Sequence, residues 1–370
     1  MGSDLCYYNL VMDVNKKETG RVTNKSYRFM MVGTITMVFA AIVTGVTFSL
    51  MNRAFFSVKE TTYIPYGAHY AFISEDPDSD FWEEVYESAK AEAENNGIYL
   101  EDMHNTINGN YSSTDLLRIA KNCDVDGIIY SGDNSEEAAG LINEAVDAGI
   151  GVVILQNDVD TSKRQCFAGI NYYELGQMYA EEIKKLRDGG SEVNSVEIIV
   201  EDNMSEGITN LITMAIEDRL TEADPEQGTP EIMILRVNAE DKFGVEESIR
   251  NVFISKDTLP DVVLCLNSVY TQCAYQAVVD YNAVGDVQIL GYFANDDILE
   301  AVNKQIISST ILIDTVEMGT MSVDALHEYN EMGYTNSYLP IDMEVINKDK
   351  AAALLKEKTE ITQDETDGGN

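Results

Sequence analysis

Short apolar runs alternate with amphipathic stretches from Tyr63 onwards. The first strand is predicted around His69–Ile73, and a helix follows in which Trp82, Val85 and Ala89 recur at helical spacing. Nearly all-apolar strands of this kind are buried on both faces, as in parallel sheets covered by helices. Two successive rounds of about 100 residues each therefore predict an α/β fold with two doubly wound parallel-sheet lobes. The other predicted strands are Ile98–Leu100, Gly127–Tyr130, Val152–Leu155, Cys166–Ile170, Val196–Val200, Ile232–Leu235, Val262–Leu266, Val287–Leu290 and Ser308–Ile313.

An apolar run at residues 29–50 contains no charged residue and no His, Pro, Asn or Gln. As a helix it is about 33 Å long, which predicts a transmembrane anchor. Residues 1–28 carry five Lys or Arg against three Asp or Glu, so they are predicted to form a short cytoplasmic tail. The chain is then single-pass in the cell membrane, with a linker at 51–62 and the main domain on the extracytoplasmic side. A cleaved signal peptide is the alternative, although the run is too long for one.

The chain is strongly acidic, with 64 Asp and Glu against 25 Lys and Arg and a formal charge of −39. Such a body repels the phosphates of nucleic acids and anionic lipid head groups. We therefore expect no nucleic-acid partner. The acidity indicates solubility in the first place, with a specific cationic ligand as the alternative.

Motifs for catalysis and for cofactors are absent from the sequence. There is no glycine-rich nucleotide loop, no G-x-S-x-G and no H-E-x-x-H, and the acidic turn Ser74–Pro77 would repel phosphate. Asp76, Asp78 and Asp80 have the spacing of a calcium loop, but Phe81 stands where that loop needs Gly. We therefore predict neither an enzyme nor a cofactor nor a metal site, and we expect Asp80 to cap the helix that it begins.

The ligand site is expected at the carboxyl ends of the strands, where parallel sheets bind their ligands. If the two lobes face each other, the loops at these ends line a shared cleft. Phe81 and Trp82 stand at the first of the loops, and aromatic rings suit the apolar faces of a sugar, while amide and carboxylate groups suit its hydroxyls. The alternative for Trp82 is packing within the helix. The loops begin near Glu75, Met103, Ser131, Gln156, Glu201, Asn267, Tyr292 and Asp314.

From about Tyr66 to Leu355 the chain resembles the type I periplasmic binding proteins, in particular the sugar-binding group related to ribose binders. The resemblance implies two lobes that are joined by three crossing segments and close on a small solute. It implies lobe one at 63–170 plus 315–343, and lobe two at 171–314 plus 344–355. The matching stretches are Asp80–Trp82, Asp126–Ile129, Ala148–Val153, Gly169–Tyr172 with Gly176, and Asp314–Gly319.

The resemblance also implies which residues contact the ligand. Phe81 and Trp82 would be the stacking aromatics, beside Asp80. The other implied contacts follow later strands or lie near the hinge: Gln156, Asn157, Asn267, Phe293 and Asp314.

Three of these positions depart from the family pattern. Gln156–Asn157 replaces the usual acidic residue and Arg, Phe293 replaces the usual Asp, and a second Arg expected near Thr209 or Asn210 is missing. Hydrogen bonds to charged groups are the stronger ones, so their loss weakens a simple pentose or hexose assignment.

The predicted function is extracytoplasmic binding of a small polar solute, carbohydrate-like in type, as the substrate-binding component of an ABC-type transport system. Its partner would be a membrane permease. The alternative is a sensing subunit that signals through a membrane histidine kinase, and an extracellular α/β enzyme is an alternative of another class. Residues 356–370 are polar and charged, which predicts a disordered tail.

Overall fold

The structure is a computed structural model that describes residues 66–238, 242–254 and 259–367, together with six isolated positions between 31 and 44. The predicted membrane anchor at 29–50 lies outside the described residues except for those six positions. The tail at 1–28 and the linker at 51–62 lie outside them entirely. Within the described part of the chain, no helix is long and apolar enough to cross a membrane.

Lobe one is built on a six-stranded parallel sheet with the order β11-β5-β4-β3-β1-β2. Its strands alternate in the faces that they bury, since Tyr70 and Phe72 join one apolar cluster and Ala71 and Ile73 another. The strands are β1 (Ala68–Ile73), β2 (Ile98–Asp102), β3 (Gly127–Tyr130), β4 (Gly151–Leu155), β5 (Cys166–Gly169) and β11 (Tyr338–Pro340).

Lobe two repeats this arrangement with the order β12-β10-β9-β8-β6-β7. Of these strands only β12 is antiparallel to its neighbour. The two orders match position by position, so β1 corresponds to β6, β3 to β8 and β4 to β9. The strands are β6 (Ser195–Glu201), β7 (Glu231–Val237), β8 (Val262–Cys265), β9 (Gln288–Tyr292), β10 (Ser309–Ile313) and β12 (Met343–Ile346).

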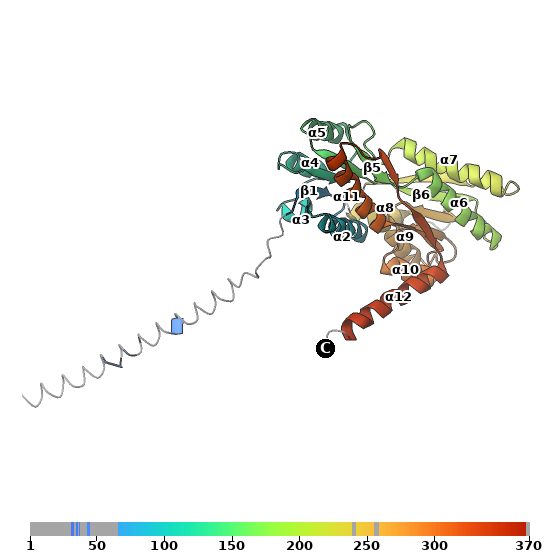
Figure 1. Cartoon of the computed structure of the whole chain (residues 1–370). Coiled ribbons are helices and arrows are strands. Elements are labelled where there is room, and N and C mark those ends of the chain that lie inside the picture. Colours follow the sequence, from blue (N-terminus) through green and yellow to red (C-terminus); the bar gives the residue numbers. More distant parts are fainter. Residues whose placement is uncertain are drawn as a thin grey trace, which may run out of the picture. The chain divides into compact units, whose positions relative to one another are not determined.

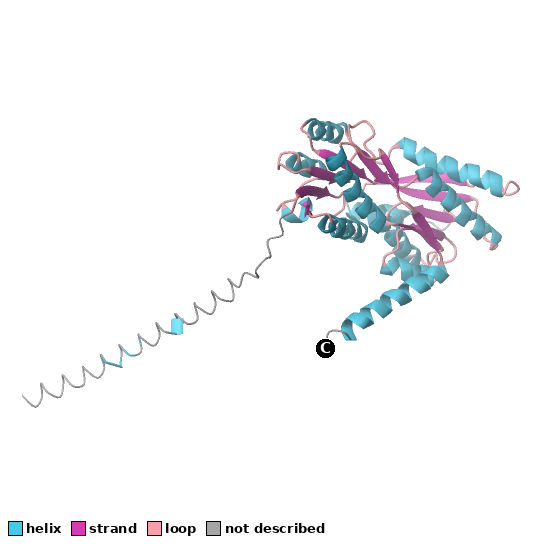
Figure 2. Cartoon of the chain, in the orientation of Figure 1, coloured by secondary structure: helices cyan, strands magenta, loops and turns pink. Residues whose placement is uncertain are grey.

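Helices cover both faces of each sheet (Figures 1 and 2). Lobe one places α2 (Asp80–Asn95) and α11 (Thr315–Met332) on one face, and α3 (Met103–Thr106), α4 (Ser113–Ala120) and α5 (Glu136–Asp147) on the other. Lobe two is covered by α6 (Tyr172–Asp188) and α7 (Glu206–Ala223) on one face. Its other face carries α8 (Lys242–Val252), α9 (Ser268–Asp280), α10 (Asp296–Asn303) and α12 (Lys348–Asp367). The predicted pair of doubly wound parallel-sheet lobes is confirmed.

The chain passes between the two sheets three times, after β5, after β10 and between β11 and β12. The crossing segments lie side by side, because Ile341 donates its backbone N–H to Gly169 (3.1 Å) and Asp314 donates to Asp342 (3.1 Å). This is the arrangement of a hinge. The residue boundaries predicted for the lobes remain a prediction.

The C-terminal segment differs from its prediction. Residues 356–370 were expected to be a disordered tail, whereas α12 continues through them to Asp367. Lys, Glu and Gln are good helix formers, so a polar composition is compatible with helix here. Ala351 is fully buried near the start of α12, which attaches this helix to lobe two.

Candidate ligand-binding cleft

Four aromatic side chains meet where the two lobes face each other. Phe81 and Trp82 come from the first turn of α2 in lobe one, while Tyr292 and Phe293 come from the end of β9 in lobe two. The ring of Phe81 lies 5.0 Å from Trp82, 5.4 Å from Phe293 and 6.4 Å from Tyr292, centroid to centroid. None of the four is more than 5% exposed. The lobes are therefore in contact through these rings, and Trp82 belongs to the apolar core as well as to the boundary.

Gln156 and Asn157, which follow β4, add polar contacts at the same boundary. The Gln156 side-chain amide donates to the Tyr292 hydroxyl in the other lobe (2.7 Å), and the Tyr172 hydroxyl donates to the Gln156 carbonyl (3.2 Å). Asn157 donates from its side chain to the Glu75 carboxylate (2.8 Å). These bonds connect the ends of β1, β4 and β9.

Backbone strain occurs at the same place in both lobes. Gln156 follows β4 with φ +61°, and Phe293 follows the corresponding strand β9 with φ +69°. The left-handed region costs a residue other than Gly about 1–3 kcal/mol, and residues held there gather at binding sites. The same unusual backbone conformation therefore recurs after corresponding strands, on both sides of the lobe boundary.

Two carboxylates stand at corresponding strand ends. Glu75 follows β1, Glu201 ends β6, and both are only partly exposed. Loss of solvent, and then the charge of Glu201, raise the pKa of the Glu75 carboxyl. Loss of solvent, and then the charge of Asp202, raise the pKa of Glu201. Glu75 also accepts hydrogen bonds from Asn157 and from the Trp82 side chain.

Several tyrosines surround this acidic centre. The Glu75 charge contributes to raising the pKa of four tyrosines whose hydroxyls have lost solvent, Tyr130, Tyr172, Tyr270 and Tyr292. They come from both lobes, so the charge of Glu75 acts on groups of lobe two as well as on those of its own lobe.

Three buried polar atoms at this boundary have no hydrogen-bond partner in the described chain. They are Oγ of Ser131 after β3, Oε1 of Gln156 and the hydroxyl of Tyr270 in the first turn of α9. Ser131 is 0% exposed and Tyr270 is 1% exposed. A buried polar group without a partner is costly, and in a binding site the ligand can supply that partner.

Two of the remaining predicted site residues, Asn267 and Asp314, cap the helices that follow them. Asn267 accepts from the backbone of Val269 at the start of α9 (2.7 Å), and the exposed Asp314 accepts from Glu317 at the start of α11 (2.7 Å). The expectation that Asp80 caps α2 is wrong, since Ser79 is the cap residue and Asp80 lies within the helix. Its carboxylate instead accepts a hydrogen bond from Asn295 in lobe two (2.7 Å), because the helix N-terminus points at the other lobe.

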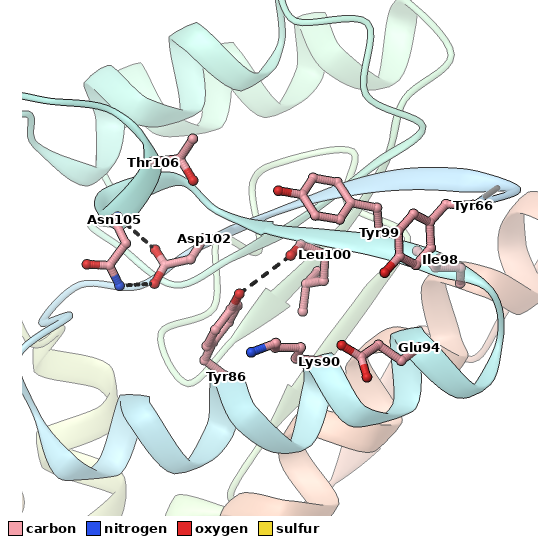
Figure 3. A pocket seen from close by; sticks show the side chains of 10 residues that line it. All are labelled: Tyr66, Tyr86, Lys90, Glu94, Ile98, Tyr99, Leu100, Asp102, Asn105 and Thr106. Carbon is pink, nitrogen blue, oxygen red and sulfur yellow. Dashed lines mark hydrogen bonds between the residues drawn. The ribbon is translucent and has the colours of Figure 1, made fainter. Parts of the chain in front are cut away.

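A separate pocket of about 290 Å³ lies on lobe one between α2 and β2 (Figure 3). Its walls include Tyr66, Tyr86, Lys90 and Tyr99, and none of the predicted ligand residues lines it. Among the described residues, no group of three or more His, Cys, Asp or Glu could hold a metal ion.

Comparison with known proteins agrees with the two-lobed fold. Residues 70–332 match the family model described as a periplasmic binding protein domain. The chain belongs to this family. No functionally curated protein matches its sequence.

Solved structures of sugar-binding proteins share the fold. GanP, a glucose-galactose binding protein from Geobacillus stearothermophilus, is 20% identical over 76% of this chain and 98% of its own, with a TM-score of 0.62. A carbohydrate transporter solute-binding protein from Agrobacterium radiobacter, in complex with D-arabinose, is 15% identical over 78% and 98%, with a TM-score of 0.66. A chain of the XylFII–LytSN complex is 21% identical over 77% and 100%, with a TM-score of 0.63.

Glu75, Glu201, Ser131 and Tyr292 were recognised in the sequence as the starts of strand-end loops, but not as site residues. Tyr270 was not predicted as a site residue, and Tyr172 was noted only as the end of the matching stretch Gly169–Tyr172. These residues lie at or after the ends of strands, and that position could have identified them. For Glu75 and Glu201 the correspondence of β1 with β6 is an additional signal.

Proposed function

We propose that the protein binds a small polar solute of carbohydrate type between its two lobes and serves as the substrate-binding component of an ABC-type transport system. The observation that carries the proposal is the meeting of strand ends from both sheets around Phe81, Trp82, Tyr292 and Gln156. Rings and amides in this combination suit a ligand with apolar faces and hydroxyl edges. The bonds between the lobes break and re-form as the hinge opens and closes.

A sensing role is the second candidate. One structural relative is the chain of a XylFII–LytSN complex, so this fold also occurs in an assembly with a second protein. In that role, closure of the lobes on the solute would be passed to a membrane partner such as a histidine kinase.

Anchoring in the membrane is part of the proposal and rests on the uncharged run at residues 29–50. With the basic residues of 1–28 on the cytoplasmic side, the binding lobes stand outside the cell. Membrane fractionation of cells that express the full chain tests this placement. Alkaline carbonate should leave the protein in the membrane pellet, and its appearance in the supernatant would contradict the anchor.

Ligand binding is tested by titrating the purified full chain with sugars, sugar derivatives and polyols while following the fluorescence of Trp82. This is the single tryptophan of the chain, so the signal comes from one position, beside the lobe boundary. A micromolar ligand, worth about −8 kcal/mol, should change the emission and raise the melting temperature when present in excess. If no member of the panel changes either signal, the carbohydrate assignment is wrong.

A further inference from the structure

The loop after β4 begins with a strained turn. Asn157 donates its backbone N–H to the Leu155 carbonyl two residues earlier (2.7 Å), and Gln156 between them has φ +61°. A three-residue turn with positive φ at its centre is a γ-turn of the strained kind, which is rare in proteins. Such strain persists only where contacts with the surrounding structure offset it. The turn also sets the directions of the Gln156 and Asn157 side chains, because the chain leaves the sheet there.

Much of the support for this turn comes from the other lobe. Within lobe one, the Gln156 N–H donates to the Ala168 carbonyl of the neighbouring strand β5 (3.2 Å). The Gln156 carbonyl instead accepts from the Tyr172 hydroxyl (3.2 Å), and the Gln156 side-chain amide donates to the Tyr292 hydroxyl (2.7 Å). Tyr172 and Tyr292 belong to α6 and β9 of lobe two. Lobe two therefore holds a strained turn at the end of a strand of lobe one.

The corresponding strand end in lobe two is held from within its own lobe. Phe293, which follows β9 with φ +69°, donates its backbone N–H to the Ile311 carbonyl (2.7 Å). The Phe293 carbonyl accepts from the buried Thr310 hydroxyl (2.6 Å). Both partners lie on β10, which is the neighbour of β9 in the same sheet. Each left-handed residue thus has a hydroxyl on its carbonyl, but at Gln156 that hydroxyl comes from across the hinge.

Tyr172 is fixed next to the hinge. It is the first residue of α6, just after β5 ends at Gly169, so it directly follows the first crossing between the two sheets. The Asn171 side chain caps α6, which fixes the start of this helix. A residue beside a hinge moves little when the lobes rotate about it, whereas the Tyr292 hydroxyl moves with the cleft face of lobe two.

We propose that Tyr172 is a positioning residue for the cleft, whose hydroxyl keeps the Gln156 turn in shape from the hinge side while the lobes open and close. With the turn held, the Gln156 side chain is directed at Tyr292. The same turn holds Asn157 where it donates to the Glu75 carboxylate (2.8 Å). The role rests on the proposed function, because it assumes that the side chains of Gln156 and Asn157 line the ligand cleft.

Tyr172→Phe tests the proposal, because it removes the hydroxyl and keeps the ring. Hydrogen exchange of the unliganded full chain, read by mass spectrometry, should become about fivefold faster in peptides that span Gln156 and Asn157, since the turn loses one supporting bond. The emission of Trp82 should change as well, because Asn157 donates to Glu75, which also accepts from Trp82.

Tyr179→Phe is the matched control on the same helix. The Tyr179 hydroxyl is buried and donates to the carbonyls of Cys265 (2.9 Å) and Gly291 (3.1 Å), both in lobe two. Its loss should lower the melting temperature at least as much as Tyr172→Phe does. It should nevertheless speed exchange at the ends of β8 and β9 rather than after β4, and leave the emission of Trp82 unchanged.

The outcomes separate this role from the proposed function. If Tyr172→Phe leaves both exchange after β4 and Trp82 emission as in the parent, or if Tyr179→Phe changes both equally, the positioning role of Tyr172 is overturned. The measurements use no solute, so a sugar panel that fails to bind would refute the proposed function and leave the result on the turn unaffected.

Discussion

At the residue scale, the acidic pair makes the unliganded protein sensitive to pH. The pKa of Glu75 is raised from its usual value to about 8, chiefly by loss of solvent and then by Glu201. Between these values the folded state holds a proton that the unfolded chain has lost. The free energy of unfolding must therefore decrease as pH rises through this range.

We expect the melting temperature of the unliganded full chain to fall between pH 5 and pH 8, and we expect Glu75→Gln to flatten that dependence. The variant should recover roughly 2 kcal/mol of unfolding free energy at pH 8, because an amide has no charge to bury. Calorimetry across this range measures the effect, with Glu217→Gln, which removes an exposed acid on α7, as the control. An equally steep decline in the Glu75 variant would show that other groups cause it.

The sequence places Phe81, Trp82, Gln156 and Asn157 correctly at strand-end positions, because the carboxyl-end rule depends only on strand direction. It does not reveal that Phe81 packs on Phe293, since that contact depends on how the second lobe lies against the first. Nor does it reveal that Glu75 and Glu201 stand at corresponding strand ends, which follows from the equivalence of the two sheets rather than from any spacing along the chain.

At the element scale, α2 and α11 approach closely because Gly319 has no side chain. A Cβ added there would meet the Val85 carbonyl, the Ser88 hydroxyl and, at 2.8 Å, the Ala89 backbone nitrogen. Gly319→Ala should therefore lower the free energy of unfolding by about 2 kcal/mol, since the two helices must move apart.

Gly140→Ala is the control for that substitution. Gly140 also lies within a helix, α5, but nothing stands within 4 Å of its added Cβ. Alanine should stabilise this helix by about 0.5–1 kcal/mol through its better helix propensity. Guanidinium unfolding followed by circular dichroism compares the two, and equal effects at both positions would contradict close packing of α2 on α11.

Long apolar strands were predictable from the sequence, but β11 was not. Its three residues end in Pro340, and two of the three are exposed. Such a strand has no periodic pattern and exists because it pairs with β5 at the sheet edge. The continuation of the final helix beyond Lys356 was not predicted either, because the residues there are polar and extend a helix that Ala351 and its neighbours attach to lobe two.

At the scale of the whole molecule, the closed arrangement depends in part on the bond between Asn295 and Asp80. Asn295→Ser removes the side-chain donor but keeps an oxygen that can cap α10, as Asn295 does for Ile298. One lost hydrogen bond is worth about 1 kcal/mol, so the ratio of closed to open molecules should fall about fivefold.

Small-angle X-ray scattering of the unliganded chain should show a larger radius of gyration for Asn295→Ser than for the parent. Solute affinity should fall by a similar factor, because more molecules must close on binding. Asn347→Ser makes the same exchange at the start of α12, where Asn347 accepts from Lys350, and should change neither quantity. An unchanged radius in the Asn295 variant would mean that this bond does not hold the lobes together.

The order in which the helices and strands are synthesised affects how lobe one folds in the cell. Synthesis of lobe one begins with β1, yet its covering helix α11 and edge strand β11 are made only after β1 to β10, which include five of the six strands of lobe two. Before then, Val85 and its neighbours on α2 have no complete core to enter. Lobe one can therefore complete its fold only after most of the chain has been synthesised. A chain that ends before residue 315 lacks α11 and β11 and cannot form a complete lobe one.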